Sequence, residues 1–292
     1  MSSMYNARML DGSGTPAGHN GSTLIRRSST RPRRRRKLKG SERLLGVFSI
    51  VAGLAIWQLI SGVFVRNELI LPTPIEAGNV LWHQLGTQTL WSNIGYSLTE
   101  VGIGFAITAV IGLLIGGAMA VSPTVHNLVQ PWVELFYVVP VIALAPLFVI
   151  IFGLGMLSKI AMVIVTSLFV IIINTEAGVR NASPDLVEMA RAFGKSRLAI
   201  FRGVQFPGSL PVMFAGLRLG VGRAFIAVVV AEMFGATRGL GYAMFSYMEN
   251  LDTSAMIADI VVLAILGYLS MKLLDLCEYL LSPYRRVDRG AK

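Results

Sequence analysis

The 292-residue chain is 54% hydrophobic and only 14% charged, whereas soluble domains are about 25% charged. This composition excludes an ordinary soluble enzyme and indicates that lipid is the solvent for most of the chain. The net charge of +10 does not indicate a nucleic-acid partner, because residues 1–43 alone hold 11 Lys or Arg and two acids. The excess charge belongs to a terminal tail, and we expect no binding to nucleic acid.

The tail, residues 1–43, is rich in Ser, Gly, Thr and Arg. It carries too little apolar surface to form a core, so we expect a disordered, basic, cytoplasmic extension. The uncharged run that follows, Leu44–Val65, has 22 residues. This run is too long for a cleavable signal peptide and long enough to cross a bilayer.

Further apolar stretches indicate more spans. Val101–Val121 and Leu135–Phe152 are uncharged. A third run, at about 154–175, contains Lys159, which must then lie near a membrane surface. Two weaker runs, at about 219–235 and 256–281, are interrupted by charged residues. Hydropathy alone therefore allows four to six spans. The full set is expected at about 44–65, 101–121, 131–152, 154–175, 219–235 and 256–281. The predicted fold is an all-α membrane protein with a transmembrane domain at 44–283 and a cytoplasmic tail at 284–292.

Lys and Arg residues orient this arrangement, because cytoplasmic flanks retain positive charge during insertion. With six spans and the N-terminus inside, 23 of the 26 basic residues fall on the inner side and three fall outside. We therefore expect both termini in the cytoplasm. The single cysteine, Cys277, and three scattered histidines offer no metal site, so no metal or cofactor is expected.

The connection expected at 176–218, between the fourth and fifth spans, is longer than most links between packed helices. Ser183 is suited to cap a helix, and Gly194 is suited to end it in a left-handed turn. Within that helix Leu186, Met189, Ala190 and Phe193 form one apolar stripe. A second short helix at about 196–205 is expected to end at Pro207. The pair predicts a docking site for a soluble partner.

This connection carries a family resemblance. Glu188-Met189-Ala190, then Gly194, then Phe206-Pro207 resemble the "EAA" motif of ABC importer permeases, which reads Glu-Ala-Ala, three residues, Gly, nine residues, Ile, one residue, Leu-Pro. The spacing matches throughout. Met189, Val204 and Phe206 depart from the pattern but remain apolar.

Other stretches resemble the nitrate, sulfonate and taurine branch of that family, among them Leu71–Pro74, Phe152–Gly155 and Gly216–Met233. The resemblance implies six spans of the type I importer architecture in a bacterial inner membrane. It also implies a homodimer, an ATP-binding ABC subunit that receives the motif, an extracytoplasmic substrate-binding protein and a small anionic substrate. Glu188, Ala190 and Gly194 are then central to ATPase coupling.

The chain has no nucleotide site of its own. Gly194-Lys195-Ser196 looks like the end of a phosphate-binding loop, but the required first glycine is replaced by Met189. We therefore expect the chain to be a transport subunit rather than an enzyme, with ATP hydrolysis in a partner.

Three ionisable residues fall within or beside expected spans: Glu134, Arg223 and Glu232. A charge inside the bilayer is costly, so each is expected to face protein or water. One hypothesis is a structural ion pair between Glu134 and Arg223. The alternative is that Arg223 attracts an anionic substrate along a translocation pathway.

Two other function classes remain open. A secondary transporter or channel driven by an ion gradient would use Glu134, Glu232 and Asp259 as proton or cation sites. No convincing internal repeat supports it. A membrane scaffold without transport would leave the capped helix pair as a generic docking site.

Overall fold

The computed structural model describes residues 39–65, 67, 69–182 and 184–281. It divides into two units, Met1–Phe48 and Ser49–Lys292. The first is described only where α1 (Lys39–Leu59) begins. The sequence predictions for residues 1–38 and for the C-terminal tail lie outside the described residues, as does the predicted cap at Ser183.

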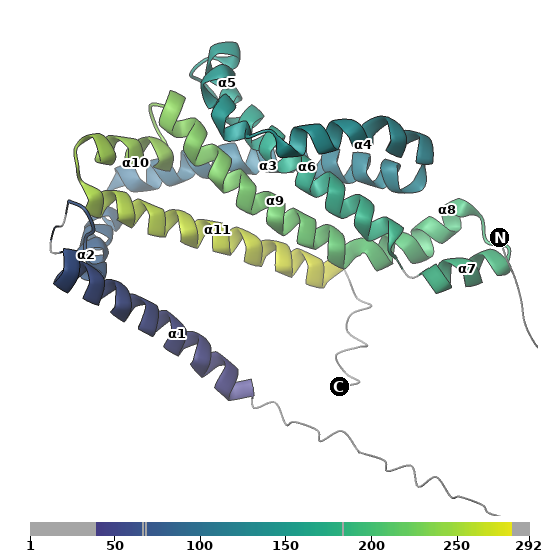
Figure 1. Cartoon of the computed structure of the whole chain (residues 1–292), viewed down its shortest axis with the longest axis horizontal. Helices are drawn as coiled ribbons and strands as arrows, with labels where there is room; N and C mark the ends of the chain where they lie inside the picture. The colour runs from purple at the N-terminus through teal and green to yellow at the C-terminus, as the bar shows by residue number, and fades with distance from the viewer. Residues whose placement is uncertain (1–38, 66, 68, 183, 282–292) are drawn as a thin grey trace, which may run out of the picture. The chain divides into compact units, whose positions relative to one another are not determined.

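The second unit is built from helices that follow α1. They are η1, a π-helical turn (Ile60–Val65), α2 (Pro74–Leu85), α3 (Gln88–Val121), α4 (Pro123–Val138), η2, a 3₁₀ turn (Val141–Leu144), α5 (Ala145–Phe152), α6 (Met156–Arg180), α7 (Pro184–Ala192), α8 (Arg197–Ile200), η3, a π-helical turn (Phe201–Gln205), α9 (Phe206–Gly235), α10 (Leu240–Glu249) and α11 (Thr253–Leu281). Figure 1 shows α7 and α8 at one end of α6 and α9, and α2 and α10 at the opposite end. We call these the α7–α8 end and the α10 end.

Within the described part of the chain, five helical stretches are long and apolar enough to cross a membrane, and the number rises to six if one bent pair is counted as a span. The five are Leu45–Val65, Gln88–Val121, Met156–Arg180, Arg197–Gly235 and Thr253–Leu281. The two weak spans of the sequence analysis thus exist as long helices. The all-α membrane fold is confirmed.

The expected span at 131–152 corresponds to the bent pair, in which α4 and the segment Val141–Phe152 meet at 80°. Pro140 causes the break, because proline lacks an amide donor and drives the preceding residue out of the helical region. Val139 accordingly has extended torsion angles, φ −63° and ψ 128°.

The boundaries of the predicted connection 176–218 are also wrong. Helix α6 continues to Arg180 and α9 already begins at Phe206, so the connection is shorter at both ends. Pro207 does not end a helix, because it lies in the first turn of α9, where its missing N–H costs little. The π turn η3 leads directly into α9, and the Phe206 amide donates to the Phe201 carbonyl.

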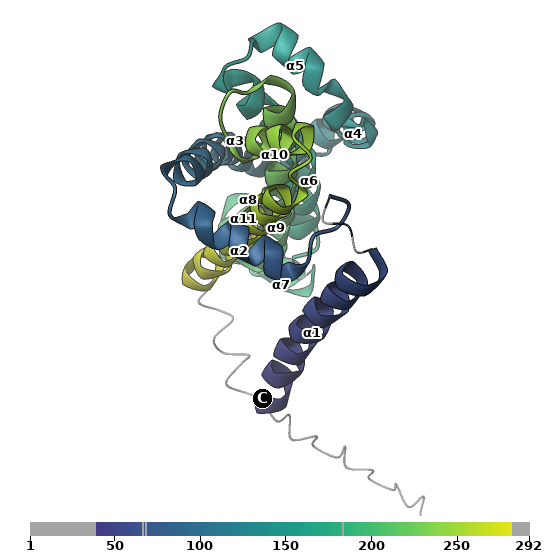
Figure 2. The ribbon, with the colours of Figure 1, turned by 90° about the vertical axis from the view of Figure 1, so that its left-hand side faces the viewer.

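Helix α6 lies at the centre of the core, with α3 on one side and α9 on the other. Figure 2 views these helices nearly end on. Glycines allow the close approach: a Cβ at Gly116 of α3 would lie 2.6 Å from the Ile172 carbonyl oxygen, and one at Gly216 of α9 would lie 2.5 Å from Asn174 Cβ. Gly112 with Gly116 on α3, and Gly216 with Gly220 on α9, have the four-residue spacing of small residues that predicts close helix packing, and these contacts confirm it.

Candidate functional site

The turn between α7 and α8 has the geometry of a Schellman motif. Gly194 has a φ of +71°, a region that glycine occupies without strain. The Lys195 amide donates to the Ala190 carbonyl (3.1 Å), and the Gly194 amide donates to the Arg191 carbonyl (2.9 Å). Ser196 then caps α8 by accepting from the Ala199 amide. The predicted left-handed stop at Gly194 is therefore present, and the two helices are joined rigidly.

The apolar stripe of α7 faces outward. Leu186, Met189 and Phe193 are 49%, 56% and 78% exposed, whereas Val187 and Ile200 are buried and anchor the segment to the bundle. Glu188 is exposed and Ala190 is partly buried. A well-defined helix pair with an uncovered apolar face is a docking surface, which we call the α7–α8 surface.

The two remaining residues of the motif connect this surface to the bundle. Phe206 is partly exposed, and its ring lies 6.1 Å from the ring of Phe201. Pro207 is half-buried in the first turn of α9. Helices α8 and α9, with η3 between them, form a continuous helical stretch, so the α7–α8 surface is joined to α9 without a break.

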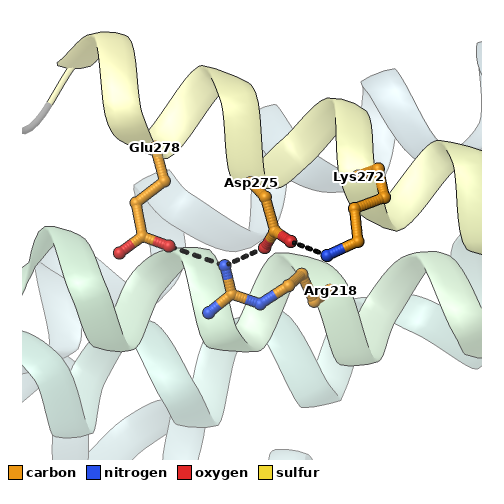
Figure 3. A network of polar contacts seen from close by, with 4 residues as sticks. All are labelled: Arg218, Lys272, Asp275 and Glu278. Carbon is orange, nitrogen blue, oxygen red and sulfur yellow. Dashed lines mark hydrogen bonds and ion pairs between the residues drawn. The ribbon is translucent and has the colours of Figure 1, made fainter. Parts of the chain in front are cut away.

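A polar network fastens α9 to α11 at the same end of the bundle (Figure 3). The Arg218 Nη1 donates to Asp275 Oδ1 (3.1 Å) and to Glu278 Oε2 (2.6 Å), and Lys272 Nζ lies 3.0 Å from Asp275 Oδ2. The three α11 residues are spaced for one helix face, as their sequence indicates. Arg218 lies 57 residues or more away in the chain, so no local pattern predicts it as their partner.

Glu232 lies at the α10 end and is fully buried. Its carboxylate accepts from the Ser97 hydroxyl and from the Gly241 amide, both at 2.6 Å. The two preceding amides are also held by side chains: Gly239 donates to Asn93 Oδ1 (3.1 Å) and Leu240 donates to Ser97 Oγ (2.9 Å). Glu232 thus belongs to a clasp that caps the start of α10.

Lys159 and Glu100 complete this clasp, and sequence reasoning missed both contributions. Lys159 Nζ donates to the carbonyl oxygens of Leu154, Gly155 and Gly235, and its side chain is buried in the protein. Glu100 is also buried, beside Glu232. Only the fold brings these residues of α3, α6 and α9 near one another.

The ion pair expected between Glu134 and Arg223 is absent from the described residues. Glu134 accepts a hydrogen bond from Gln130, one turn earlier in α4 (2.5 Å). The Arg223 guanidinium instead lies over the Tyr137 ring, 5.3 Å from its centroid. The break after Val138 decides the arrangement, because it ends α4 one residue beyond Tyr137 and turns the chain away.

The acidic residues assigned to an ion-gradient mechanism are not brought together. Glu134 is exposed, Glu232 is enclosed in the clasp, and Asp259 is buried in α11 with its Oδ1 unpaired among the described residues. They lie on three different helices.

Comparisons with known proteins agree with this geometry. Residues 109–286, more than half of the chain, match the family model of the binding-protein-dependent transport system inner membrane component. The chain is 33% identical over 230 residues to the taurine transport system permease protein TauC of Escherichia coli, covering 77% of this chain and 84% of that protein. It is 35% identical over 223 residues to the putative aliphatic sulfonates transport permease protein SsuC of the same organism, covering 76% and 85%.

A solved structure supports the fold. The inward-facing MetNI methionine ABC transporter matches with a TM-score of 0.55 and 23% identity, over 66% of this chain and 94% of that chain. The family model, the relatives and the arrangement of spanning helices all lead to one assignment. The chain belongs to the family of inner membrane components of binding-protein-dependent transport systems, the permeases of ABC importers.

Proposed function

We propose that this chain is the membrane-spanning subunit that carries a small organic anion, such as a sulfonate, into a bacterial cell with energy from ATP. The substrate class rests on relatives named for taurine and aliphatic sulfonates. A more distant relative, 30% identical, is named for formylaminopyrimidine, so the family name alone does not fix the substrate.

The orientation follows from the basic residues. The α7–α8 surface lies on the segment that holds Arg191, Lys195, Arg197 and Arg202, and positive flanks are retained in the cytoplasm. We therefore assign the α7–α8 end and both termini to the cytoplasm. The α10 end then faces the outside, where a substrate-binding protein delivers cargo.

The observation that carries the proposal is the α7–α8 surface. Its exposed apolar residues suit burial in a groove of a soluble ATP-binding subunit, which would supply the hydrolysis. Motion of that subunit would move α7 and α8 as one body because the Gly194 turn is hydrogen-bonded on both sides. Helix α9 would follow, and the Arg218 network would carry α11 with it.

Alternating access then arises between two copies of the chain and two ATP-binding subunits. Glycine-mediated contacts of α3 and α9 with α6 keep each copy rigid, so the copies rock against each other rather than deform. The break at Pro140 supplies the irregular segment that such a pathway needs, because non-helical backbone at membrane depth must face protein or water.

The docking role is tested by copurification with the ATPase encoded beside this chain. Phe193→Ser should release the ATPase in mild detergent, because it removes a large apolar side chain from the centre of the surface. Trp82→Ser is the matched control, since Trp82 is equally exposed, at 77% against 78% for Phe193, but lies on α2 at the opposite end.

Retention of the ATPase by Phe193→Ser at the level of the wild type would contradict the docking surface. Uptake that continues without ATP but stops with a protonophore would instead favour an ion-gradient mechanism and overturn the proposed energy source.

A further inference from the structure

Arg223 is a cation in the middle of a spanning helix without an acidic partner among the described residues. It lies roughly midway along α9, and its charge contacts the face of the Tyr137 ring. An Arg over an aromatic ring keeps most of its hydrogen-bond donors free, because the ring binds the flat face of the guanidinium. A free guanidinium at this depth is costly unless it meets water or an anion.

The guanidinium borders a cavity of about 160 Å³ at the break between α4 and α5. The lining residues that the argument uses are Phe136, Tyr137, Pro140, Thr166, Phe169 and Arg223. Since a water molecule takes about 30 Å³ of liquid, the cavity has room for a molecule of a few heavy atoms. It combines one cation with an aromatic wall, in which the rings of Phe136 and Phe169 are stacked at 5.8 Å, and this suits a short alkyl chain that carries an acidic head group.

The Tyr137 side chain is suited to hold the guanidinium in place. Tyr137 stands at the end of α4, where the chain turns by 80°, and its hydroxyl has no hydrogen bond to another described residue. Thr166 is not a competing donor, because its hydroxyl already donates to the Met162 carbonyl at 2.7 Å. The donors available to an anion are therefore the Arg223 guanidinium and the Tyr137 hydroxyl.

The surroundings indicate a wet site rather than a lipid-facing one. Pro140 and Ala143 of the break are exposed in the single chain, and irregular backbone is tolerated at membrane depth only against protein or a water-filled space. Broken helices that carry substrate sites near the bilayer midplane occur in transporters for this reason.

We infer that Arg223, positioned by Tyr137 at the α4–α5 break, binds the sulfonate or carboxylate group of the transported molecule during its passage. This inference rests on the proposed function and adds the residue that contacts the cargo. The planar guanidinium offers two parallel N–H donors to two oxygens of the head group. The rings of Phe136 and Phe169 contact the carbon chain.

The test is ATP-dependent uptake of labelled taurine and ethanesulfonate into proteoliposomes that contain the complete importer. Arg223→Gln should lower maximal uptake by about tenfold or more, the effect of losing a charged hydrogen bond. Arg223→Lys should restore part of it, because the charge is retained while the paired N–H donors are lost. The half-saturating substrate concentration should stay near the wild-type value, since binding-protein delivery precedes this step, and ATP hydrolysis should continue.

Arg238→Gln is the matched control. Arg238 also lies over a tyrosine ring, that of Tyr96, at 5.2 Å, and donates to its hydroxyl at 2.6 Å, but it is outside the cavity lining. Tyr137→Phe retains the ring and should cost less uptake than Tyr137→Leu, which removes the support of the guanidinium. The amount of assembled complex is measured for each variant, so that uptake is expressed per complex.

Two results overturn the inference while leaving the proposed function intact. One is uptake by Arg223→Gln equal to that of Arg238→Gln, and the other is an equal loss in Arg223→Gln and Arg223→Lys, which indicates a structural role without charge dependence. A wild-type importer that hydrolyses ATP but moves neither sulfonate contradicts the proposed substrate class, and the inference fails with it.

Discussion

The clasp around Glu232 gives a prediction that can be read at individual amides. In the wild type, three consecutive amides at the start of α10 donate to the side chains of Asn93, Ser97 and Glu232. Glu232→Ala removes the acceptor of the Gly241 amide. It also leaves the Ser97 hydroxyl without the carboxylate that it contacts at 2.6 Å. The start of α10 should therefore open more often.

The size of the effect follows from the bond that is lost. A hydrogen bond to a charged group contributes about 1.5–3 kcal/mol, which corresponds to about a 10- to 150-fold change in an equilibrium constant. Glu232 is fully buried, so water does not replace the lost acceptor without local opening. We expect hydrogen-exchange protection at Gly241 to fall by about tenfold or more.

Hydrogen exchange followed by mass spectrometry on the chain in lipid nanodiscs measures this directly, on peptides that cover residues 236–245. Glu249→Ala is the control, because Glu249 is an exposed residue at the far end of the same helix. Glu232→Gln should have a smaller effect, since its amide oxygen remains an acceptor. Protection in Glu232→Ala within about twofold of the control would refute the clasp.

Three further predictions concern packing, coupling and the α9–α11 network. Gly116→Ala should lower the melting temperature, because its Cβ would lie 2.6 Å from the Ile172 carbonyl oxygen, whereas Gly117→Ala should be neutral because it meets nothing within 4 Å. The overpacking cost is about 1–3 kcal/mol, measured as a thermal shift in detergent. Gly194→Ala should reduce ATP-coupled uptake, because a residue with a side chain pays about 1–2 kcal/mol to adopt a φ of +71°. Gly194→Asn should reduce uptake less, since asparagine adopts this left-handed conformation more readily. Equal uptake by the two variants would contradict the strain argument. Arg218→Gln should lower the melting temperature more than Lys272→Gln, because Arg218 contacts both Asp275 and the largely buried Glu278 carboxylate, whereas Lys272 contacts Asp275 alone among the ion pairs of the described residues and is more exposed. Equal shifts would contradict this ranking.

Local sequence signals determined the parts of the molecule that depend on neighbouring residues. The uncharged runs predicted spanning helices because a bilayer requires about 20 apolar residues whatever the fold. Gly194 predicted the turn between α7 and α8 because a left-handed residue is a property of the local backbone. The small-residue pairs on α3 and α9 predicted close helix packing, and the glycine contacts with α6 confirm it.

Helix ends and breaks were predicted less well, because a proline can either stand in the first turn of a helix or interrupt one. Pro207 was expected to end a helix, but its position in the first turn of α9 removes the penalty. Pro140 was expected to lie within one span, yet it separates two segments at 80°. Proline is therefore tolerated at position 207 but breaks the helix at position 140. The outcome depends on whether its missing amide donor and the carbonyl beside its ring belong to an ongoing helix.

The amino-acid sequence is enough to identify a multi-span helical membrane protein with a helix pair between two spans, since periodicity, spacing and hydropathy are local properties. The partners of the charged residues, by contrast, follow from how the helices pack. Glu232 accepts from Ser97, Arg218 pairs with Asp275 and Glu278, and Arg223 lies over Tyr137 and not beside Glu134. The physical reason is that an unpaired charge in lipid is costly, so each charged side chain is stabilised by a polar or aromatic group that helix packing brings within reach. The register between packed helices selects that group, and distance along the chain does not.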